Sequence, residues 1–228
     1  MLKNLPGVFY EPLYVLGVGM LTLVILFFFL RKNREVEVLP PAHSSKWEVR
    51  FSFLVAVIAA LFVGLRPNDP CFVDSQIYIG YYNQLRGADV SFDFGVRNLI
   101  FDNMLALMAA QNWSWRVFIL LVAALYFVGI WFACRKLFPK HVLISYLVYL
   151  GALCTFAYGT NTLKSGVAAS IFLMAVAYKD KLVWAGLLLW ASLGFHHSMV
   201  LPIGGIEYST KSYRNPLLPP QFRPVDNK

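Results

Sequence analysis

The sequence contains little charge. Only 14% of its 228 residues are Asp, Glu, Lys or Arg, whereas 58% are hydrophobic. A water-soluble domain has about a quarter charged residues and about half apolar residues. A soluble protein of this composition would need a core too large for a chain of this length. The composition therefore indicates a protein that lies mostly within a lipid bilayer.

Cysteine is also scarce, and it forms no recognisable pattern. The chain contains three cysteines, Cys71, Cys134 and Cys154. Their spacing resembles no metal site and implies no disulfide pairing. We interpret them as small apolar residues that fill space. The sequence has no internal repeat or low-complexity tract, and no group of residues predicts a metal or a cofactor.

Acidic residues are fewer than basic ones, so the formal net charge is +8. Such an excess can indicate a nucleic-acid partner. Here, however, the basic residues cluster next to apolar segments, a pattern typical of topology control and contact with lipid headgroups. We therefore expect the partner of this charge to be the lipid bilayer, and no nucleic acid.

Long apolar runs are abundant. A helix needs about 20 residues to cross the hydrocarbon core, and the runs predict an all-α, polytopic membrane protein with about six transmembrane helices. The first run has only Lys3 before it and is followed by Arg31 and Lys32, which indicates a retained helix rather than a cleaved signal peptide. The six runs cover residues 8–30, 48–65, 116–134, 141–159, 163–178 and 182–203.

The charges of the connecting loops predict the orientation of the helices. Residues 31–50, 135–140 and 179–181 are rich in Lys and Arg, so the positive-inside rule places them in the cytoplasm. The long loop 66–115 is net acidic and is expected outside. This alternation requires that 99–111 does not span the membrane, and we expect an interfacial or re-entrant helix there.

Residues 1–205 are therefore expected to form one transmembrane domain. Beyond them prolines accumulate and the apolar periodicity is lost. This pattern is typical of disorder, so 206–228 are predicted to be a disordered tail. Isolated polar residues inside or beside the apolar runs are then the candidates for function.

One polar cluster precedes the fifth apolar run, in the stretch YGTNTLKSG. If a helix begins near 160–162, hydroxyl or amide side chains are available to cap it, and Asn161, Lys164 and Ser165 share one face. The helix N-terminus and the lysine would then meet at the outer membrane boundary, an arrangement suited to a phosphate or pyrophosphate. Alternatively, Lys164 extends to the outer headgroups and binds no substrate.

Two histidines interrupt the sixth apolar run. His196 and His197 precede Ser198 in an otherwise apolar stretch. A histidine there can accept a proton near neutral pH or donate to an oxyanion. The alternative is a hydrogen bond between helices. Because a helix rises about 1.5 Å per residue, we expect both histidines near the level of Lys164.

The outer loop carries a third cluster. Asp74, Tyr78 and Tyr81 follow the spacing i, i+4, i+7, so one helical face would present a carboxylate and two aromatic rings, which suit a sugar. The alternative is an interfacial tyrosine belt. Arg66, just before the loop, can bind a phosphate through two donors, or it can anchor the end of the second span.

Three short patterns occur in order along the chain. They are Arg66, Asp74, Ser75 and Tyr78, then Asn161, Lys164, Gly166, Ala168 and Ser170, and finally Phe195, His196, Ser198, Leu201 and Pro202. Over roughly residues 50–203 the chain resembles the EpsG family of exopolysaccharide and capsule biosynthesis membrane proteins, which are grouped with Wzy-type polysaccharide polymerases. Lysine stands where that family usually has arginine in the second pattern. Because such proteins generally have further spans after the histidines, we also expect a truncated member.

The resemblance implies glycosyl transfer on the outer face of the bacterial cytoplasmic membrane. The growing glycan would move from polyprenyl pyrophosphate to a hydroxyl of the next lipid-linked oligosaccharide repeat. Other capsule-assembly membrane proteins are further expected partners. Lys164 and Arg66 would bind the pyrophosphate, and Asn161 and Ser165 would add hydrogen bonds.

The remaining site residues complete this hypothesis. His196 is expected to be the base or orienter for the attacking hydroxyl, with Asp74 as the second candidate, while Tyr78 and Tyr81 would hold the sugar. Other functions stay open at this point. They are a non-catalytic transport or assembly subunit, an inactive fragment, and a membrane acyltransferase that uses an outer histidine. An intramembrane protease fits less well, because no glycine-flanked nucleophile motif is present.

Overall fold

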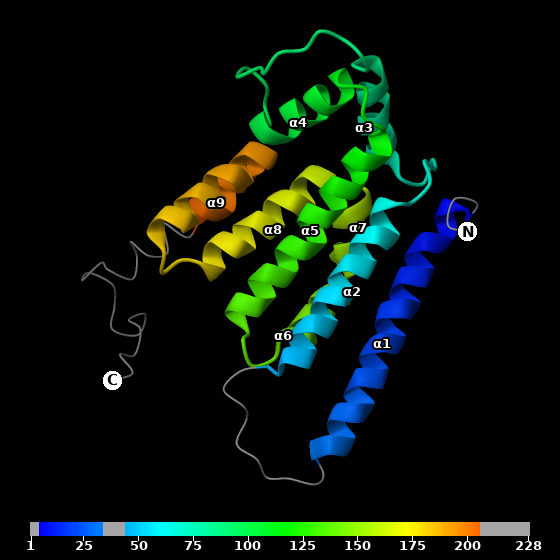
Figure 1. The fold of residues 1–228 in the computed structure, drawn as a ribbon, viewed down its shortest axis with the longest axis vertical. Coiled ribbons are helices and arrows are strands. Elements are labelled where there is room, and N and C mark those ends of the chain that lie inside the picture. Colours follow the sequence, from blue (N-terminus) through cyan, green and yellow to red (C-terminus); the bar gives the residue numbers. More distant parts are fainter. Residues whose placement is uncertain (1–4, 34–43, 206–228) are drawn as a thin grey trace.

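A computed structural model of the chain describes residues 5–33 and 44–205. Every regular element in these residues is a helix (Figure 1), so the predicted all-α class is confirmed. The predicted tail, 206–228, lies outside the described residues. The helices are η2 (Gly7–Phe9), α1 (Tyr10–Asn33), α2 (Lys46–Gly64), α3 (Val73–Gln84), α4 (Leu99–Ala110), α5 (Trp115–Leu137), α6 (Val142–Leu150), α7 (Leu153–Thr160), α8 (Leu163–Ala177), α9 (Leu182–Phe195) and η3 (His197–Met199).

Three helical segments are long and apolar enough to cross a membrane by themselves. They are Gly7–Phe28, which joins η2 to most of α1, Lys46–Gly64 and Trp115–Leu137. These segments coincide with the first three predicted spans. The capping box at the start of α2, in which Ser45 and Glu48 exchange hydrogen bonds with each other's backbone N–H, marks where that span begins.

The fourth predicted span, 141–159, is not one continuous helix. α6 and α7 bend by 75° at a short break, and together they have the length and composition of one broken span. Polar side chains bind carbonyl groups at the break. Thr155 Oγ1 donates to the Tyr149 carbonyl (2.6 Å), and the Tyr126 hydroxyl donates to the Thr155 carbonyl (3.3 Å). A broken helix is tolerated at membrane depth when the protein satisfies its backbone in this way.

The last two predicted spans are shorter than expected. α8 has 15 residues and α9 has 14, fewer than the about 20 that a straight crossing needs. α9 ends at Phe195 because His196 adopts an extended backbone, with φ −153° and ψ 112°. Within the described residues, length and composition therefore support three spans, or four with the bent pair, where the sequence predicted six.

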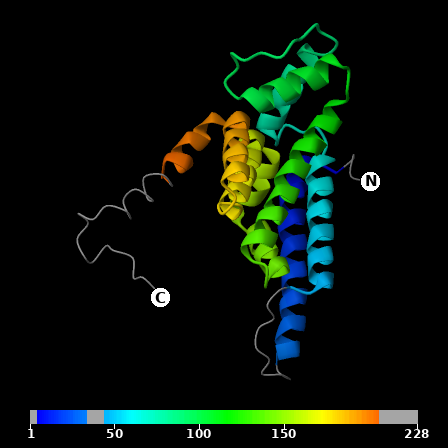
Figure 2. The same ribbon diagram turned by 60° about the vertical axis from the view of Figure 1, so that its left-hand side comes forward.

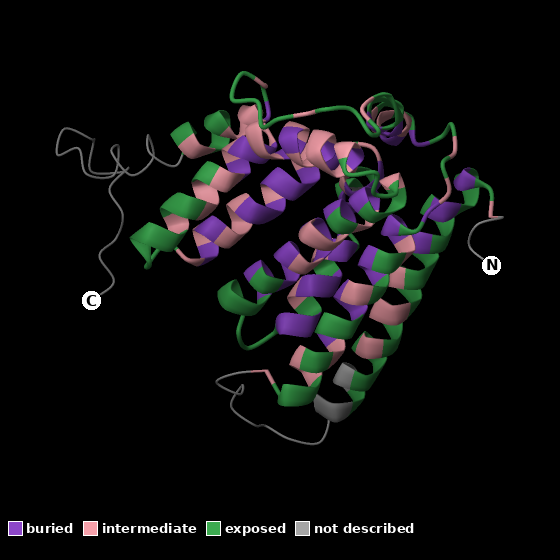
Figure 3. Ribbon diagram, turned by 45° about the horizontal axis from the view of Figure 1, so that its top comes forward, coloured by how far each residue is buried: buried purple, intermediate pink, exposed green. Residues whose placement is uncertain are grey.

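α5 is the central helix of the molecule. α2 packs on one side of it and α8 on the other, and α9 packs against α8 (Figures 1 and 2). Side-chain hydrogen bonds join these layers: Trp131 Nε1 donates to Ser52 Oγ (2.9 Å), and Ser192 Oγ donates to the Ala168 carbonyl (2.8 Å). α1 lies at the edge and exposes most of its surface (Figure 3).

The outer loop folds into two short helices at one end of the long ones. α3 and α4 lie there in Figure 1, and α4 packs against α9 near the end that leads to His196. α4 has 12 residues, which agrees with the prediction that 99–111 does not span. Gly194 lets α4 and α9 approach, because a Cβ at this position would lie 2.6 Å from the Ile100 side chain. The outer loop is therefore packed directly against α9.

Candidate functional site

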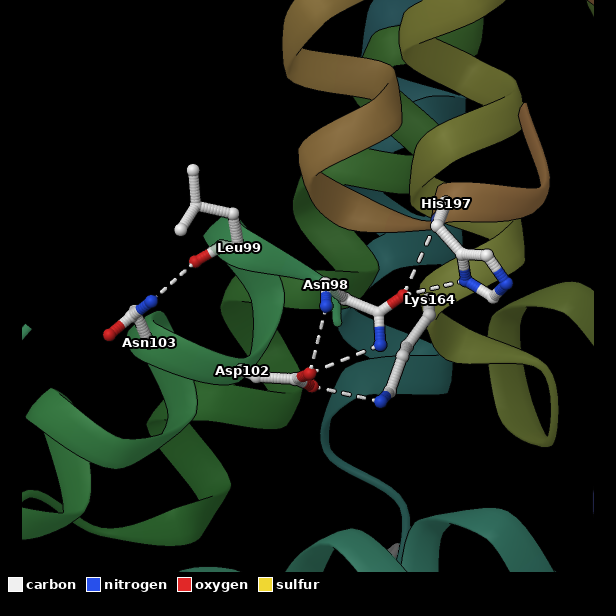
Figure 4. Close-up of polar contacts among 6 residues, drawn as sticks. All are labelled: Asn98, Leu99, Asp102, Asn103, Lys164 and His197. Carbon is white, nitrogen blue, oxygen red and sulfur yellow. Dashed lines mark hydrogen bonds and ion pairs between the residues drawn. The ribbon is translucent and has the colours of Figure 1, made fainter. Parts of the chain in front are cut away.

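Lys164, near the start of α8, forms an ion pair with the outer loop. Its Nζ lies 2.9 Å from Asp102 Oδ1 on α4 (Figure 4). The two side chains keep 20% and 27% of their surface exposed. The pair joins residues 62 positions apart in the sequence. Lys164 is therefore neither free nor simply extended to the headgroups.

A chain of hydrogen bonds continues from Asp102 toward the histidines. Asp102 Oδ2 accepts from the backbone N–H and from the side-chain Nδ2 of Asn98, each at 3.1 Å. Asn98 Oδ1 in turn faces the backbone N–H of His197 (3.4 Å) and its Nδ1 (3.5 Å) (Figure 4). Asn98 is only 5% exposed. It therefore links the outer loop to the segment that follows α9.

Arg97 sets the tautomer of His197 in this arrangement. An Arg97 Nη2 atom lies 2.6 Å from His197 Nε2, and a guanidinium can only donate. His197 Nε2 therefore accepts, which leaves Nδ1–H to donate toward Asn98. Two cations, Arg97 and Lys164, thus lie at the two ends of this series of hydrogen bonds, which contains one carboxylate, Asp102.

Aromatic rings form one wall of the cluster. The rings of Tyr78 (α3) and Phe101 (α4) meet edge to face at 5.2 Å, and Lys164 Nζ lies 5.2 Å and 5.1 Å from their centroids. Cation–π attraction at such distances stabilises the ammonium group. Partial burial, followed by the nearby carboxylates of Asp74 and Asp102, raises the pKa of Tyr78 to about 12. Its hydroxyl is therefore a neutral donor at physiological pH.

Arg66 is buried and holds three elements together. Its Nη1 donates to the Val63 carbonyl at the end of α2 (2.7 Å). Its Nη2 donates to Ser75 Oγ on α3 and to the Thr160 carbonyl at the end of α7 (3.0 Å). Ser75 Oγ also donates to the Thr160 carbonyl (2.6 Å). Burial lowers the pKa of Arg66 to about 10, so it remains charged.

Two buried polar atoms near the cluster have no hydrogen-bond partner among the described residues. They are His196 Nδ1 and Asn161 Oδ1. The rings of His196 and His197 lie 5.2 Å apart. Buried polar atoms normally have a partner, so these two atoms are places where a bound group would gain a hydrogen bond.

The expected capping of α8 is not found. α8 begins at Leu163, and its N-cap residue Thr162 makes no side-chain cap bond. Asn161 belongs to the end of α7, where its backbone N–H donates to the Ala157 carbonyl (2.8 Å). Asn161 therefore does not share a helical face with Lys164 and Ser165, as the sequence spacing predicted.

The other predicted site residues lie around this cluster. Ser165 and Asp74 are half-buried. Tyr81 is 57% exposed, whereas its neighbour Tyr82 is buried and donates to the Trp113 carbonyl (3.1 Å). The α3 face that points inward therefore carries Tyr78 and Tyr82, and Tyr81 faces away from the protein.

Sequence reasoning missed Asp102 and Asn98 as site residues. In the sequence, Asp102 and Asn103 stand together as an interruption of the apolar stretch 99–111. In the structure Asn103 is the residue that anchors the loop, since it exchanges hydrogen bonds with the Asp93 backbone and donates to the Leu99 carbonyl (Figure 4). A charged residue inside an apolar segment was the available signal. Its partner could not be found without the fold.

The described residues contain no group of three or more His, Cys, Asp or Glu side chains that could hold a metal ion. The cluster itself presents cations, amides, hydroxyls and imidazoles. These can bind an anion and can accept or donate a proton.

Comparison with known proteins identifies the family. Residues 49–210 match the EpsG family, whereas no curated protein and no solved structure gave a significant match. The matched segment begins within α2 and includes every helix that contributes to the Lys164 cluster. The chain therefore belongs to the EpsG family, and it is a membrane protein of polysaccharide biosynthesis.

Proposed function

We propose that the chain is a polysaccharide polymerase. It joins polyprenyl-pyrophosphate-linked oligosaccharide repeats at the outer face of the cytoplasmic membrane. The observation that carries this proposal is the cluster in which Lys164, Tyr78 and the two histidines come together at the end of the helices that the positive-inside rule assigns to the outside. Family membership supports the polysaccharide part of the proposal.

In the proposed reaction, a hydroxyl of the incoming repeat attacks the anomeric carbon of the growing glycan. The new carbon–oxygen bond forms as the bond from that carbon to the pyrophosphate oxygen breaks. The bonding electron pair leaves with the lipid pyrophosphate, and the hydroxyl proton goes to a base. The protein's contribution is to position both lipids and to stabilise the negative charge of the leaving group.

Lys164 is the proposed contact for the pyrophosphate. Its ion pair with Asp102 is partly exposed, and exposed pairs contribute about 1 kcal/mol or less. A pyrophosphate carries more negative charge than one carboxylate, so it can compete for the ammonium group. Asn161 and Ser165 are placed close by in sequence to add hydrogen bonds, and the unpartnered Asn161 Oδ1 is available to a hydroxyl.

His196 is the proposed base, with Asp74 as the second candidate. The Nδ1 atom of His196 is buried and has no partner among the described residues, so a substrate hydroxyl that enters the cluster would supply the missing hydrogen bond. Tyr78 and the exposed Tyr81 are the proposed sugar contacts. Arg66 already gives its donors to three protein acceptors, so within this proposal it positions α2, α3 and α7 rather than reaching the pyrophosphate.

The test compares glycan chain length in cells that carry variants of the chain. We expect Lys164→Ala and His196→Ala to shorten the glycan strongly, and Lys164→Arg to retain part of the activity because it keeps the charge. Arg86→Ala is the matched control, since Arg86 is an exposed basic residue of the outer loop. Immunoblots of membranes would establish that each variant inserts. Wild-type chain length in an inserted Lys164→Ala or His196→Ala variant would contradict the proposal.

A non-catalytic assembly subunit is the second candidate function. It is favoured by the internal pairing of both cations, since Lys164 already contacts Asp102 and Arg66 is satisfied by protein acceptors. A deletion strain separates the two functions. Accumulation of unpolymerised lipid-linked repeats on the outer face supports the polymerase, and loss of these repeats from the outer face supports a transport or assembly role.

A further inference from the structure

A groove lies at the other end of the helices, where α5, α8 and α9 meet. It has a volume of about 390 Å³ and is lined by Phe132, Met174, Tyr178, Lys181, Trp184 and Leu188. This size falls within the range of about 300–1,000 Å³ in which small ligands bind. All but one of the lining residues are apolar or aromatic, so the groove suits a hydrocarbon chain.

Basic side chains surround the mouth of this groove. Lys181 lines it directly, and Lys136 at the end of α5 lies over the Tyr178 ring, with Nζ 5.7 Å from the centroid. Within the described part of the chain, neither lysine has an ion-pair partner. Lys179 lies in the same turn as Lys181, and the residue between them, Asp180, is acidic. The mouth of the groove therefore carries a net positive charge.

The groove also opens onto the exposed surface of the helices. Trp184 is 61% exposed and Phe132 is 42% exposed, so the apolar walls continue onto the outer surface of the helices. Tyr and Trp side chains prefer the boundary between hydrocarbon and headgroups. α9 begins here without a side-chain cap, which adds the positive end of its dipole to the same place. Apolar walls and a cationic mouth thus lie where an acyl chain meets its headgroup.

We infer that this groove binds an anionic phospholipid, with one acyl chain against Leu188 and Phe132 and the phosphate between Lys136 and Lys181. Basic pockets between helices at the cytoplasmic side are suited to anionic headgroups. The inference does not rest on the proposed polymerase activity, because the groove is formed by the opposite ends of α5 and α8 from those that carry the Lys164 cluster.

The headgroup part of the inference is tested by lipid binding to the purified full chain in detergent, measured by native mass spectrometry. We expect phosphatidylglycerol to bind more tightly than phosphatidylcholine. Lys181→Gln and Lys136→Gln should each weaken the binding of phosphatidylglycerol by about fivefold, the effect of one basic residue near an anionic headgroup. Lys140→Gln is the matched control, because Lys140 is an exposed lysine of the adjacent loop that does not line the groove.

The acyl-chain part is tested by filling the groove. Leu188→Trp should weaken the binding of phosphatidylglycerol several-fold. Leu187→Trp should not, because Leu187 is 54% exposed and lies outside the groove. Inorganic phosphate, added at the same concentration, should not displace the lipid. Equal weakening by all three lysine variants, no effect of Leu188→Trp, or displacement by inorganic phosphate would each overturn the inference.

Discussion

Lys164 shows how a cation is accommodated at the edge of the membrane domain. Its ammonium group faces a carboxylate at 2.9 Å and two aromatic rings at just over 5 Å. Lysine is a compact, strongly hydrated charge on a flexible stem, so it can exchange one anion for another without a fixed geometry. Arg66 is the opposite case, because its planar group is fixed by three acceptors on different elements.

Asp69 and Cys71 join the N-terminal turn to the outer loop. The Asp69 carboxylate accepts from the backbone N–H of Cys71 (3.0 Å) and of Gly7 (2.9 Å), and these bonds lower its pKa. Partial burial of the thiol, and after it the neighbouring Asp69 carboxylate, raises the pKa of Cys71 to about 11. The thiolate is the reactive form, so this thiol is expected to react slowly at neutral pH.

The labelling rate of Cys71 should therefore depend steeply on pH. In a chain with Cys134→Ala and Cys154→Ala, we expect the rate of reaction with a maleimide to rise about tenfold per pH unit from about pH 7 to about pH 10. Asp69→Asn removes the negative neighbour, which lowers the pKa of Cys71 and should make labelling several-fold faster at pH 8. Mass spectrometry would follow the reaction. A rate that levels off near about pH 8.5, the ordinary thiol pKa, would contradict the raised pKa.

At the scale of elements, the contact between α7 and α8 fixes the position of the Lys164 backbone at the start of α8. Gly166 lies against the last turns of α7, and a Cβ on it would lie 2.5 Å from the Tyr158 carbonyl oxygen. Small residues permit such close approach between helices in membranes. Since the end of α7 also carries the Thr160 carbonyl that accepts from Arg66, this contact links the two cationic residues through the backbone.

A methyl group at Gly166 should therefore destabilise the protein. We expect Gly166→Ala to lower the free energy of unfolding by about 1–3 kcal/mol, because backbone atoms must shift to make room. Gly186→Ala is the control, since a Cβ at this helical position in α9 meets no atom within 4 Å, and replacing a helical glycine by alanine stabilises by about 0.5–1 kcal/mol. Thermal unfolding in detergent, followed by circular dichroism, would compare them. Equal effects of both substitutions would argue against the close contact.

α4 is the element that completes the Lys164 cluster. It is too short to span, yet its residue Asp102 contacts Lys164, and Asn98, the residue just before it, contacts His197. Its charged and amide residues were visible in the sequence as interruptions of an apolar stretch. The side that they face could not be predicted, because it depends on how α4 packs against α9.

At the scale of the whole molecule, the polar groups are divided between two ends. The Lys164 cluster lies with α3 and α4 at one end, and the basic loops 135–140 and 179–181 lie at the opposite ends of α5 and α8 (Figure 1). The positive-inside rule predicts that the basic end is cytoplasmic. The proposed polymerase requires this orientation, because its lipid-linked substrates are used outside.

Single cysteines would test the orientation directly. In a chain without its native cysteines, we expect Arg86→Cys to react with a membrane-impermeant maleimide in intact cells, and Lys140→Cys to react only after the membrane is opened. Both positions are exposed, so access to the reagent depends on the side of the membrane alone. Reaction of both variants in intact cells would place the two ends on the same side and remove the basis of the proposed function.

The number of spans could be predicted only in part from the apolar runs. Hydropathy located the long apolar helices, but it did not detect that 141–159 breaks into α6 and α7, or that His196 ends α9. Both breaks depend on tertiary hydrogen bonds and packing, such as the bond from Tyr126 on α5 to the Thr155 carbonyl. A broken helix and a straight one can have the same apolar composition.

By itself, the sequence determined that this is an all-helical membrane protein with a long polar loop, and its motifs identified the family. Composition and loop charge act through the solvent and the bilayer, so they do not depend on which helices are neighbours. Only the tertiary structure decided that Lys164 meets Asp102, that Arg66 is enclosed, and that Tyr81 faces outward. These outcomes depend on contacts between residues far apart in the chain, which no local pattern encodes.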